Sequence, residues 1–372
     1  MASIEKIGEH VIYENPLPQL RSACAKFPAL VQLPSGELLA MFELGQAFES
    51  VDSQTVISRS SDSGRTWQLQ GRLYDTEELD LDWPVSECLK PTLLKDSTLV
   101  AIGYRFHRSD PDLPIGNPKT GGLLPGDNVV SFSSDYGITW STPEIIKHPY
   151  PETLEVSGPC VELDSGDILA TGCPFKMWDG SNPTGQTGIL LRSKDKGRTW
   201  DSSCRYFTTP GGQISPWESR ICTMPVGRIV VIVWAFDMGA NKHLPNLVTV
   251  SHDNGTTWSE PINTGHMGQA SNLMWLGNDM LLTVHAHREG EPGLYVRLVD
   301  FKNDKWKMVR QEVIWCEAPC QDTSRGIIEQ FANLKFGQPS LLKLENDDIL
   351  ATHWCVENCL YKIKTHRLKI KL

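Results

Sequence analysis

One eight-residue pattern, Ser-x-Asp-x-Gly-x-Thr-Trp, occurs four times in the 372 residues and constrains the fold more than any other feature of the sequence. Its copies span residues 60–67, 133–140, 193–200 and 251–258, and a degenerate fifth copy ends at Trp306. Asp can accept hydrogen bonds from the backbone N–H groups of a tight turn, Gly permits a positive φ, and Trp offers a large apolar surface. We therefore expect each copy to close a β-hairpin, so these Asp residues are structural rather than catalytic.

A second pattern counts the repeated units. It consists of a strand, a tight turn and another strand, and its six copies begin near residues 26, 90, 158, 220, 272 and 338. Six copies in 372 residues leave about 62 residues for each, which suits four-stranded sheets arranged around an axis. The last copy lacks the octapeptide, so we expect the N-terminal segment His10–Tyr13 to supply its outer strand and remove a free edge. The sequence predicts an all-β, six-bladed β-propeller of four-stranded antiparallel blades, forming a single domain over residues 1–372.

Composition and charge limit the possible partners. The chain has 35 Lys and Arg against 45 Asp and Glu, and the resulting net charge of −10 argues against nucleic-acid binding through a broad basic surface. The N-terminal residues contain no apolar run of signal-peptide length, and no segment approaches the roughly 20 apolar residues that a membrane-spanning helix needs. Ten Cys residues form no Cys-x-x-Cys pair. We expect a cytoplasmic protein with reduced thiols, no membrane association and no cofactor.

The propeller topology brings ionisable residues together at one end of the axis. The start of each first strand and the end of each second strand share that end, whereas the tight turns lie at the other. The first-strand starts contribute Lys26, Lys90, Glu155, Glu218, Arg220, Asn272 and Gln338. The second-strand ends contribute Glu43, Arg105, Asp237, His285, His287, Arg288 and His353. Two long segments, 104–128 and 174–187, should overhang the same end, so the sequence predicts an axial pocket.

The two repeats together resemble the sialidase (neuraminidase) superfamily, whose six-bladed propellers carry this octapeptide as the Asp-box. The resemblance implies that a catalytic acid lies in the loop before the first Asp-box, and this loop contains Glu49 and Asp52. It also implies a Glu that partners a nucleophilic Tyr, and Glu218 lies at the matching position. Two positions depart from the family. Lys26 stands where an Arg binds the substrate carboxylate, and it lacks the bidentate fork of a guanidinium. Gln338 stands at the position of the Tyr and cannot act as a nucleophile.

We predict a sialidase-like carbohydrate-active enzyme, an exo-acting glycoside hydrolase for a small acidic or polar saccharide. The candidate catalytic residues are Asp52, Glu49, Glu218 and His287. The candidate substrate-binding residues are Lys26, Lys90, Arg105, Arg220, Arg288, Gln338, His353 and Trp178, and Arg325 is a further available cation. No metal is assigned. Trp178 can stack on a sugar ring or be an ordinary packed side chain.

Three alternatives stay open at this point. His287, with its neighbour His285, could act as the base of a lyase that removes the proton next to a uronate carboxylate. Two or three of the His residues could instead bind a divalent metal. The third alternative is a propeller that binds saccharides without catalysis, which the loss of the Tyr favours.

Overall fold

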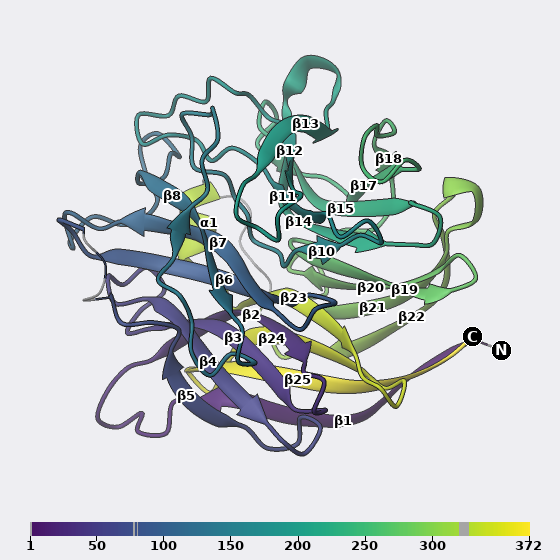
Figure 1. The fold of residues 1–372 in the computed structure, drawn as a ribbon, viewed down its shortest axis with the longest axis horizontal. Coiled ribbons are helices and arrows are strands. Elements are labelled where there is room, and N and C mark those ends of the chain that lie inside the picture. Colours follow the sequence, from purple (N-terminus) through teal and green to yellow (C-terminus); the bar gives the residue numbers. More distant parts are fainter. Residues whose placement is uncertain (1, 77–78, 80, 320–326) are drawn as a thin grey trace.

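The structure is a computed structural model that describes residues 2–76, 79, 81–319 and 327–372. These residues form six antiparallel β-sheets arranged around a central axis (Figure 1). The first strands of neighbouring blades contact one another, so they surround the axis, while later strands lie further out. The six-bladed β-propeller predicted from the repeats is therefore confirmed.

The first three blades follow the chain in order. Blade 1 contains β2 (Cys24–Gln32), β3 (Leu38–Gly45), β4 (Gln54–Ser60) and β5 (Gln68–Arg72). Blade 2 contains β6 (Val85–Leu93), β7 (Leu99–His107), β8 (Gly126–Ser133) and β9 (Glu144–Ile145). Blade 3 contains β10 (Val161–Glu162), β11 (Ile168–Gly172), β12 (Gly188–Ser193) and β13 (Asp201–Phe207).

The last three blades complete the ring. Blade 4 contains β14 (Ile214–Thr223), β15 (Ile229–Asp237), β17 (Leu247–Ser251) and β18 (Ile262–Asn263), and a short fifth strand, β16 (Lys242–His243), also pairs with β15. Blade 5 contains β19 (Ser271–Gly277), β20 (Met280–His287), β21 (Gly293–Asp300) and β22 (Lys307–Trp315). Blade 6 contains β23 (Phe336–Lys343), β24 (Ile349–Glu357), β25 (Leu360–Lys371) and β1 (Ser3–Glu14). The helix α1 (Ile327–Ala332) precedes blade 6.

The N-terminal strand closes the ring, as the sequence predicts. β1 pairs antiparallel with β25 from Ser3 opposite Lys371 to Glu14 opposite Lys362, a longer pairing than the four residues expected. The two chain ends consequently lie side by side (Figure 1). This pairing covers the hydrogen-bonding edge that β25 would otherwise expose.

The four octapeptides form the turns expected of them. In the first copy the Asp62 carboxylate accepts the backbone N–H groups of Arg65 and Thr66 at 3.0 and 2.9 Å, and Ser60 Oγ accepts the N–H of Gly64 at 2.8 Å. Trp67 Nε1 donates to the Gly64 carbonyl at 3.1 Å. The same Ser, Asp and Trp contacts recur in the other three copies. These Asp residues are engaged in holding turns.

Arginines tie three of these turns to the preceding blade. Arg59 on β4 donates to Glu37 of its own blade at 2.8 Å and to the carbonyl of Tyr136, in the octapeptide of the next blade, at 2.6 Å. Arg192 and Arg367 make the equivalent pair of contacts from blades 3 and 6. The repeated turn therefore joins neighbouring blades as well as closing its own hairpin.

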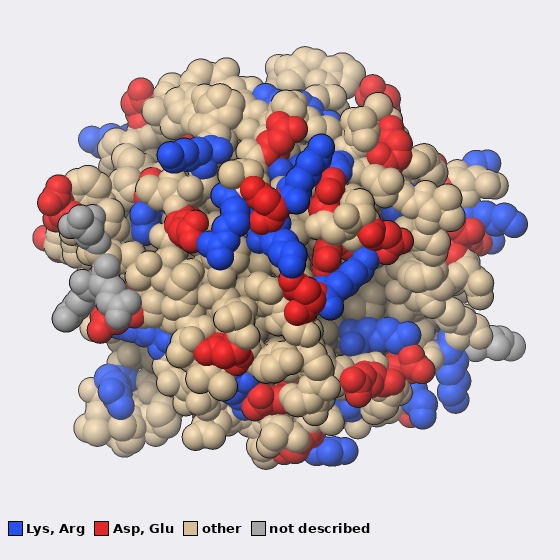
Figure 2. Space-filling model, in the orientation of Figure 1, with Lys and Arg blue, Asp and Glu red and all other residues tan. Residues whose placement is uncertain are grey.

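The apolar core is divided into six clusters, and each lies between two neighbouring blades. Each sheet thus buries both faces against its neighbours, which explains the continuous apolar stretches in strands such as β15. Over the face seen in Figure 2, Lys and Arg are interspersed with Asp and Glu rather than gathered by sign. Within the described parts of the chain, no helix combines the length and apolar character needed to cross a bilayer.

A buried histidine in blade 6 should make folding sensitive to acid. His353 is 0% exposed, stacks on His366 at a ring distance of 5.0 Å, and has no hydrogen-bond partner among the described residues. Burial, reinforced by the charges of His366 and Lys364, holds the pKa of His353 well below its usual value of 6.5. The unfolded chain therefore binds a proton that the folded chain does not, and stability falls as pH drops below about 6.5.

We expect the replacement His353→Phe to remove the loss of stability that protonation of His353 causes at low pH. Relative to the variant, the native protein should lose up to about 1.4 kcal/mol of unfolding free energy per pH unit below pH 6.5. Urea unfolding of both proteins at several pH values between 7.5 and 5 measures the difference. A difference that does not change with pH would contradict a neutral, buried His353.

Candidate functional site

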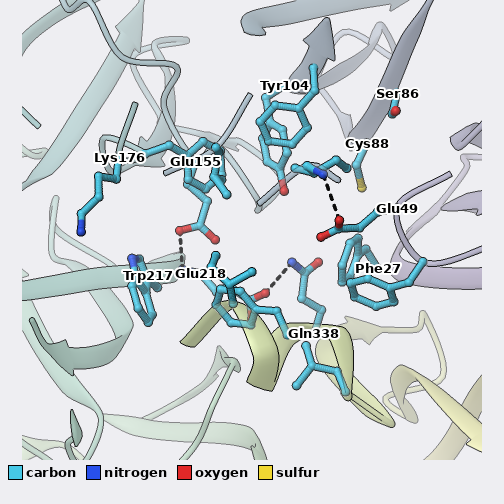
Figure 3. Close-up of a pocket in the computed structure, with 18 of the residues that line it drawn as sticks. Phe27, Glu49, Ser86, Cys88, Tyr104, Glu155, Lys176, Trp217, Glu218 and Gln338 are labelled. Atoms are coloured by element: carbon cyan, nitrogen blue, oxygen red, sulfur yellow. Dashed lines mark hydrogen bonds between the residues drawn. The ribbon is translucent and has the colours of Figure 1, made fainter. Parts of the chain in front are cut away.

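A cavity of about 190 Å³ lies where the first strands of several blades converge, and residues far apart in the sequence line it (Figure 3). Four of the sequence-predicted site residues line this cavity: Lys26, Glu49, Glu218 and Gln338. Glu155, which the sequence places at the same end of the axis without a role, lines it as well. The structure therefore brings together side chains from blades 1, 3, 4 and 6.

Three of the lining residues lie at the same kind of local distortion. Phe27, Glu218 and Gln338 have φ values of +59°, +44° and +39°, and each lies within a β-bulge of the first strand of its blade. A bulge redirects a side chain, whereas a positive φ is costly for any residue other than Gly and persists only where surrounding contacts enforce it. Blades 1, 4 and 6 thus each place a side chain in the cavity wall through a β-bulge with a positive φ.

Glu155 and Glu218 form a close pair of acidic residues. Glu155 Oε2 accepts the Glu218 backbone N–H at 3.3 Å and the Cys173 thiol at 3.3 Å. Burial raises the pKa of Glu155, and the charge of Glu218 raises it further. Glu218 Oε1 accepts the side-chain N–H of Gln338 at 2.8 Å, as Figure 3 shows. The cavity therefore contains one carboxyl group that favours its protonated form beside a second carboxyl group.

The basic residues near the cavity are engaged by the protein itself. Lys26 is 2% exposed, and its Nζ lies 2.5 Å from Glu43 Oε1. Lys90 donates to the Phe27 carbonyl and to Cys88 Sγ, the latter at 3.0 Å, and burial lowers the pKa of Lys90.

The predicted arginines are also engaged. Arg220 donates to Ser157 Oγ at 3.0 Å and to the Ser219 carbonyl at 2.9 Å. Arg105 pairs with Asp127 at 3.0 Å, and Arg288 donates to the Phe336 carbonyl at 3.0 Å. Lys90, Arg105, Arg220 and Arg288 do not line the cavity. Arg325 lies outside the described residues.

Acidic residues outnumber basic ones along the described cavity wall. Five glutamates line it, against Lys26 and Lys176: Glu43, Glu49, Glu87, Glu155 and Glu218. Glu49 accepts the Ile115 N–H at 2.9 Å, and burial raises the pKa of Glu49. Glu87 accepts the Tyr74 hydroxyl, and burial raises the pKa of Glu87 to about 7. The wall is poorly suited to an anionic ligand, because Glu43 already pairs with Lys26.

Two long segments cover the cavity, as their lengths predict. They are joined by the Leu123 N–H, which donates to the Lys176 carbonyl at 2.8 Å, and by Asn117 and Thr120, which both donate to the Trp178 carbonyl. Leu123 and Lys176 line the cavity. Trp178 contributes its backbone to this roof, and its half-buried ring is not part of the lining.

Helix α1 and the residues that follow it complete the wall, and no pattern in the sequence predicts this helix. Ile328, Phe331 and Leu334 line the cavity, and Phe331 packs against Trp217 and Trp234 at ring distances of 6.0 Å. The only sequence signal is a short apolar segment between the blade 5 and blade 6 repeats, too short to be recognised as a helix.

The remaining predicted residues lie elsewhere. The Asp52 carboxylate accepts the Gln46 N–H at 3.1 Å and is not part of the cavity wall. His287 packs its half-buried ring against Tyr295, whereas His285 is fully buried and hydrogen-bonded to Ser271. No His belongs to the described lining, and among the described residues no three His, Cys, Asp or Glu side chains are grouped to hold a metal.

Known proteins of similar structure share the fold of this chain but differ from one another in activity. No protein-family model and no curated protein sequence matches this chain. A Dyadobacter fermentans protein of unknown function is 20% identical, with a TM-score of 0.76 and 99% of both chains covered. A Penicillium chrysogenum α-L-arabinanase complexed with arabinobiose is 15% identical, with a TM-score of 0.63 and 98% of both chains covered. A Streptococcus pneumoniae sialidase is 12% identical, with a TM-score of 0.64, over 97% of this chain and 70% of the sialidase.

The chain has the sialidase-like propeller fold. The resemblance indicated by the repeats is therefore confirmed for the architecture, which this protein shares with glycoside hydrolases of different specificity. At such low identities the likeness does not extend to the reaction, because one fold can host unrelated chemistry.

The roof over the propeller cavity depends on a glycine. A Cβ added at Gly122 would lie 1.8 Å from the Met177 carbonyl oxygen, so Gly122→Ala must push the two roof segments apart. We expect faster amide hydrogen exchange in residues 117–125 and 174–180, measured by mass spectrometry. The matched control is Lys119→Ala, which removes an exposed side chain from the same segment. Unchanged exchange in Gly122→Ala would show that the two segments do not depend on this close approach.

Proposed function

We propose that this protein is a glycoside hydrolase that releases a single neutral sugar residue from a chain end. The observation that carries this proposal is the Glu155–Glu218 pair inside a covered cavity. Glycoside hydrolysis commonly requires one carboxyl group that donates a proton and a second that is ionised. The raised pKa of Glu155 suits it to the first role. The occurrence of the same fold in an arabinanase and a sialidase supports the proposal.

Each residue of the pair has a distinct task in this mechanism. Glu155 donates its proton to the glycosidic oxygen as the bond to the leaving group breaks. Glu218 stabilises the positive charge that develops at the anomeric carbon. A water molecule then bonds to that carbon and gives a proton to the Glu155 carboxylate, which restores the acid. Because the roof and α1 cover the cavity, the reaction takes place where water is restricted and electrostatic interactions are strong. The mechanism needs no Tyr at the position of Gln338.

The charges of the wall favour a neutral substrate over an acidic one. Five glutamates line the cavity, while Lys26 is committed to Glu43 and Arg220 to its own blade and a neighbour. A substrate carboxylate would meet like charge, and no guanidinium lies in the described wall to bind it. The aromatic side chains of Trp217 and Phe27 line the cavity and add apolar surface to its wall.

The size of the cavity favours attack at a chain end. Its volume of about 190 Å³ is below the roughly 300–1,000 Å³ typical of sites for larger ligands. A single terminal ring suits this space better than an internal stretch of polysaccharide. The lyase alternative has no support in the described cavity, because His287 lies outside its wall.

Replacement of either glutamate should abolish turnover without unfolding the protein. We expect Glu155→Gln and Glu218→Gln each to lower kcat by about 10²-fold or more, since each removes a group needed in the transition state. Hydrolysis of arabinobiose and of a panel of neutral 4-nitrophenyl glycosides measures the effect, with sialyllactose as the acidic comparison. The control is Asp52→Asn, whose carboxylate only accepts a backbone N–H and which should retain activity. Full activity in either glutamate variant would remove the proposed pair, and binding without any product would favour the non-catalytic alternative.

The activity should be lost as pH rises. Glu155 must carry a proton to act as the acid, and its pKa lies above the usual glutamate value of 4.5, so kcat/KM should fall tenfold per pH unit above that raised pKa. The Cys173 thiol lowers the pKa of Glu155 by donating to its carboxylate. Cys173→Ala should therefore move the alkaline limb of the pH profile to higher pH. A shift to lower pH, or none, would contradict the assignment of Glu155 as the acid.

A further inference from the structure

The side-chain amide of Gln338 is the one side-chain donor bonded to Glu218 among the described residues. Its Nε2 lies 2.8 Å from Glu218 Oε1, and no basic side chain in the described parts of the chain forms an ion pair with Glu218. Glu155 has weaker donors, a thiol and a backbone N–H, both at 3.3 Å. The two carboxyl groups of the pair therefore differ in the hydrogen bonds available to their ionised forms.

We propose that Gln338 is a positioning residue that holds the ionised carboxylate of Glu218 in place, and thereby leaves the proton of the pair on Glu155. The inference rests on the proposed function, and it names the residue that makes Glu155 the acid and Glu218 the ionised carboxylate. A donor to a carboxylate stabilises the ionised form. When two carboxyl groups lie close together and share one proton, the better-solvated carboxylate gives the proton up. An amide suits this task because it donates a hydrogen bond at every working pH without itself ionising.

The backbone around Gln338 is built to hold this amide in place. Gln338 is 3% exposed and adopts φ = +39° within the bulge of β23. On one side, Arg288 donates to the Phe336 carbonyl, and a Cβ added at Gly337 would lie 2.1 Å from an Arg288 nitrogen. On the other side, Asn272 Nδ2 donates to the Pro339 carbonyl at 3.3 Å. Arg288, which the sequence assigns to substrate binding, thus lies where it supports the Gln338 bulge.

Other titratable and charged groups also act on the pair, so its pH response has several contributors. Five groups interact electrostatically with Glu218: Glu155, Arg220, Arg288, Tyr104 and Cys173. Tyr104 is half-buried, and desolvation raises its pKa well above 10, so it remains neutral. Gln338 differs from all of these groups because it bonds the Glu218 carboxylate directly and does not titrate.

The variant Gln338→Met tests this role because it keeps the length of the side chain and removes the donor. We expect kcat to fall about tenfold to a hundredfold with a smaller change in KM, and the acidic limb of the kcat/KM profile to move to higher pH by about one unit. Gln338→Glu should lower kcat further, because it places a third carboxyl group beside the pair. Gln68→Met, on an exposed position of β5, is the matched control. A purely structural role would lower the thermal midpoint and leave the pH profile unchanged, and that result would overturn the proposal.

A measurement without substrate separates this inference from the proposed function. Carbon-13 NMR of glutamate side-chain carboxyl groups follows their titration in the native protein, with Glu155→Gln and Glu218→Gln used to assign the two resonances. In Gln338→Met we expect the Glu218 resonance to titrate at higher pH than in the native protein. If Glu218 titrates at the same pH in Gln338→Met and in the native protein, and the native protein hydrolyses glycosides, the positioning role is wrong and the proposed function stands. If that titration shifts as expected while no glycoside is hydrolysed, the positioning role stands and the hydrolase function fails.

Discussion

The pairing of β1 with β25 is the interaction on which the rest of the structure depends. Each blade buries apolar side chains on both faces, so no blade is stable without a neighbour on each side. A ring supplies those neighbours only if it closes, and here an N-terminal strand completes the sheet begun by the C-terminal strands. Arg367 reinforces the closure by bonding Asp348 in blade 6 and the Ser63 carbonyl in blade 1.

Closure also explains why the cavity can contain strained residues and a high density of acids. Phe27, Glu218 and Gln338 keep positive φ values because the surrounding first strands hold them in place. Burial in the confined wall raises the pKa values of Glu49, Glu87 and Glu155, and the charge of Glu218 raises that of Glu155 further. A stable ring therefore provides the free energy that a strained and like-charged site requires.

The two residues that depart from the sialidase pattern, Lys26 and Gln338, each contact a glutamate of the cavity wall. Lys26 is neutralised by Glu43 and does not offer a free cation to a substrate carboxylate. Gln338 bonds Glu218, the residue that a nucleophilic Tyr would partner in that family. Glu155, one blade away, supplies the second carboxyl group. These contacts around Glu155 and Glu218 are the basis of the proposed function.

The sequence by itself determined the architecture, because it repeats two local patterns, the octapeptide turn four times and the strand-turn-strand unit six times. It also determined which end of the axis collects Lys26, Glu155, Glu218 and Gln338, since strand direction follows from the order of the turns. Only the tertiary structure decided which of these side chains share the cavity. Lys90, Arg220 and His353 have suitable chemistry, but they are buried and do not line the cavity. The bulges and the packing of α1 arise from contacts between distant segments, and a pattern confined to one segment cannot specify such contacts.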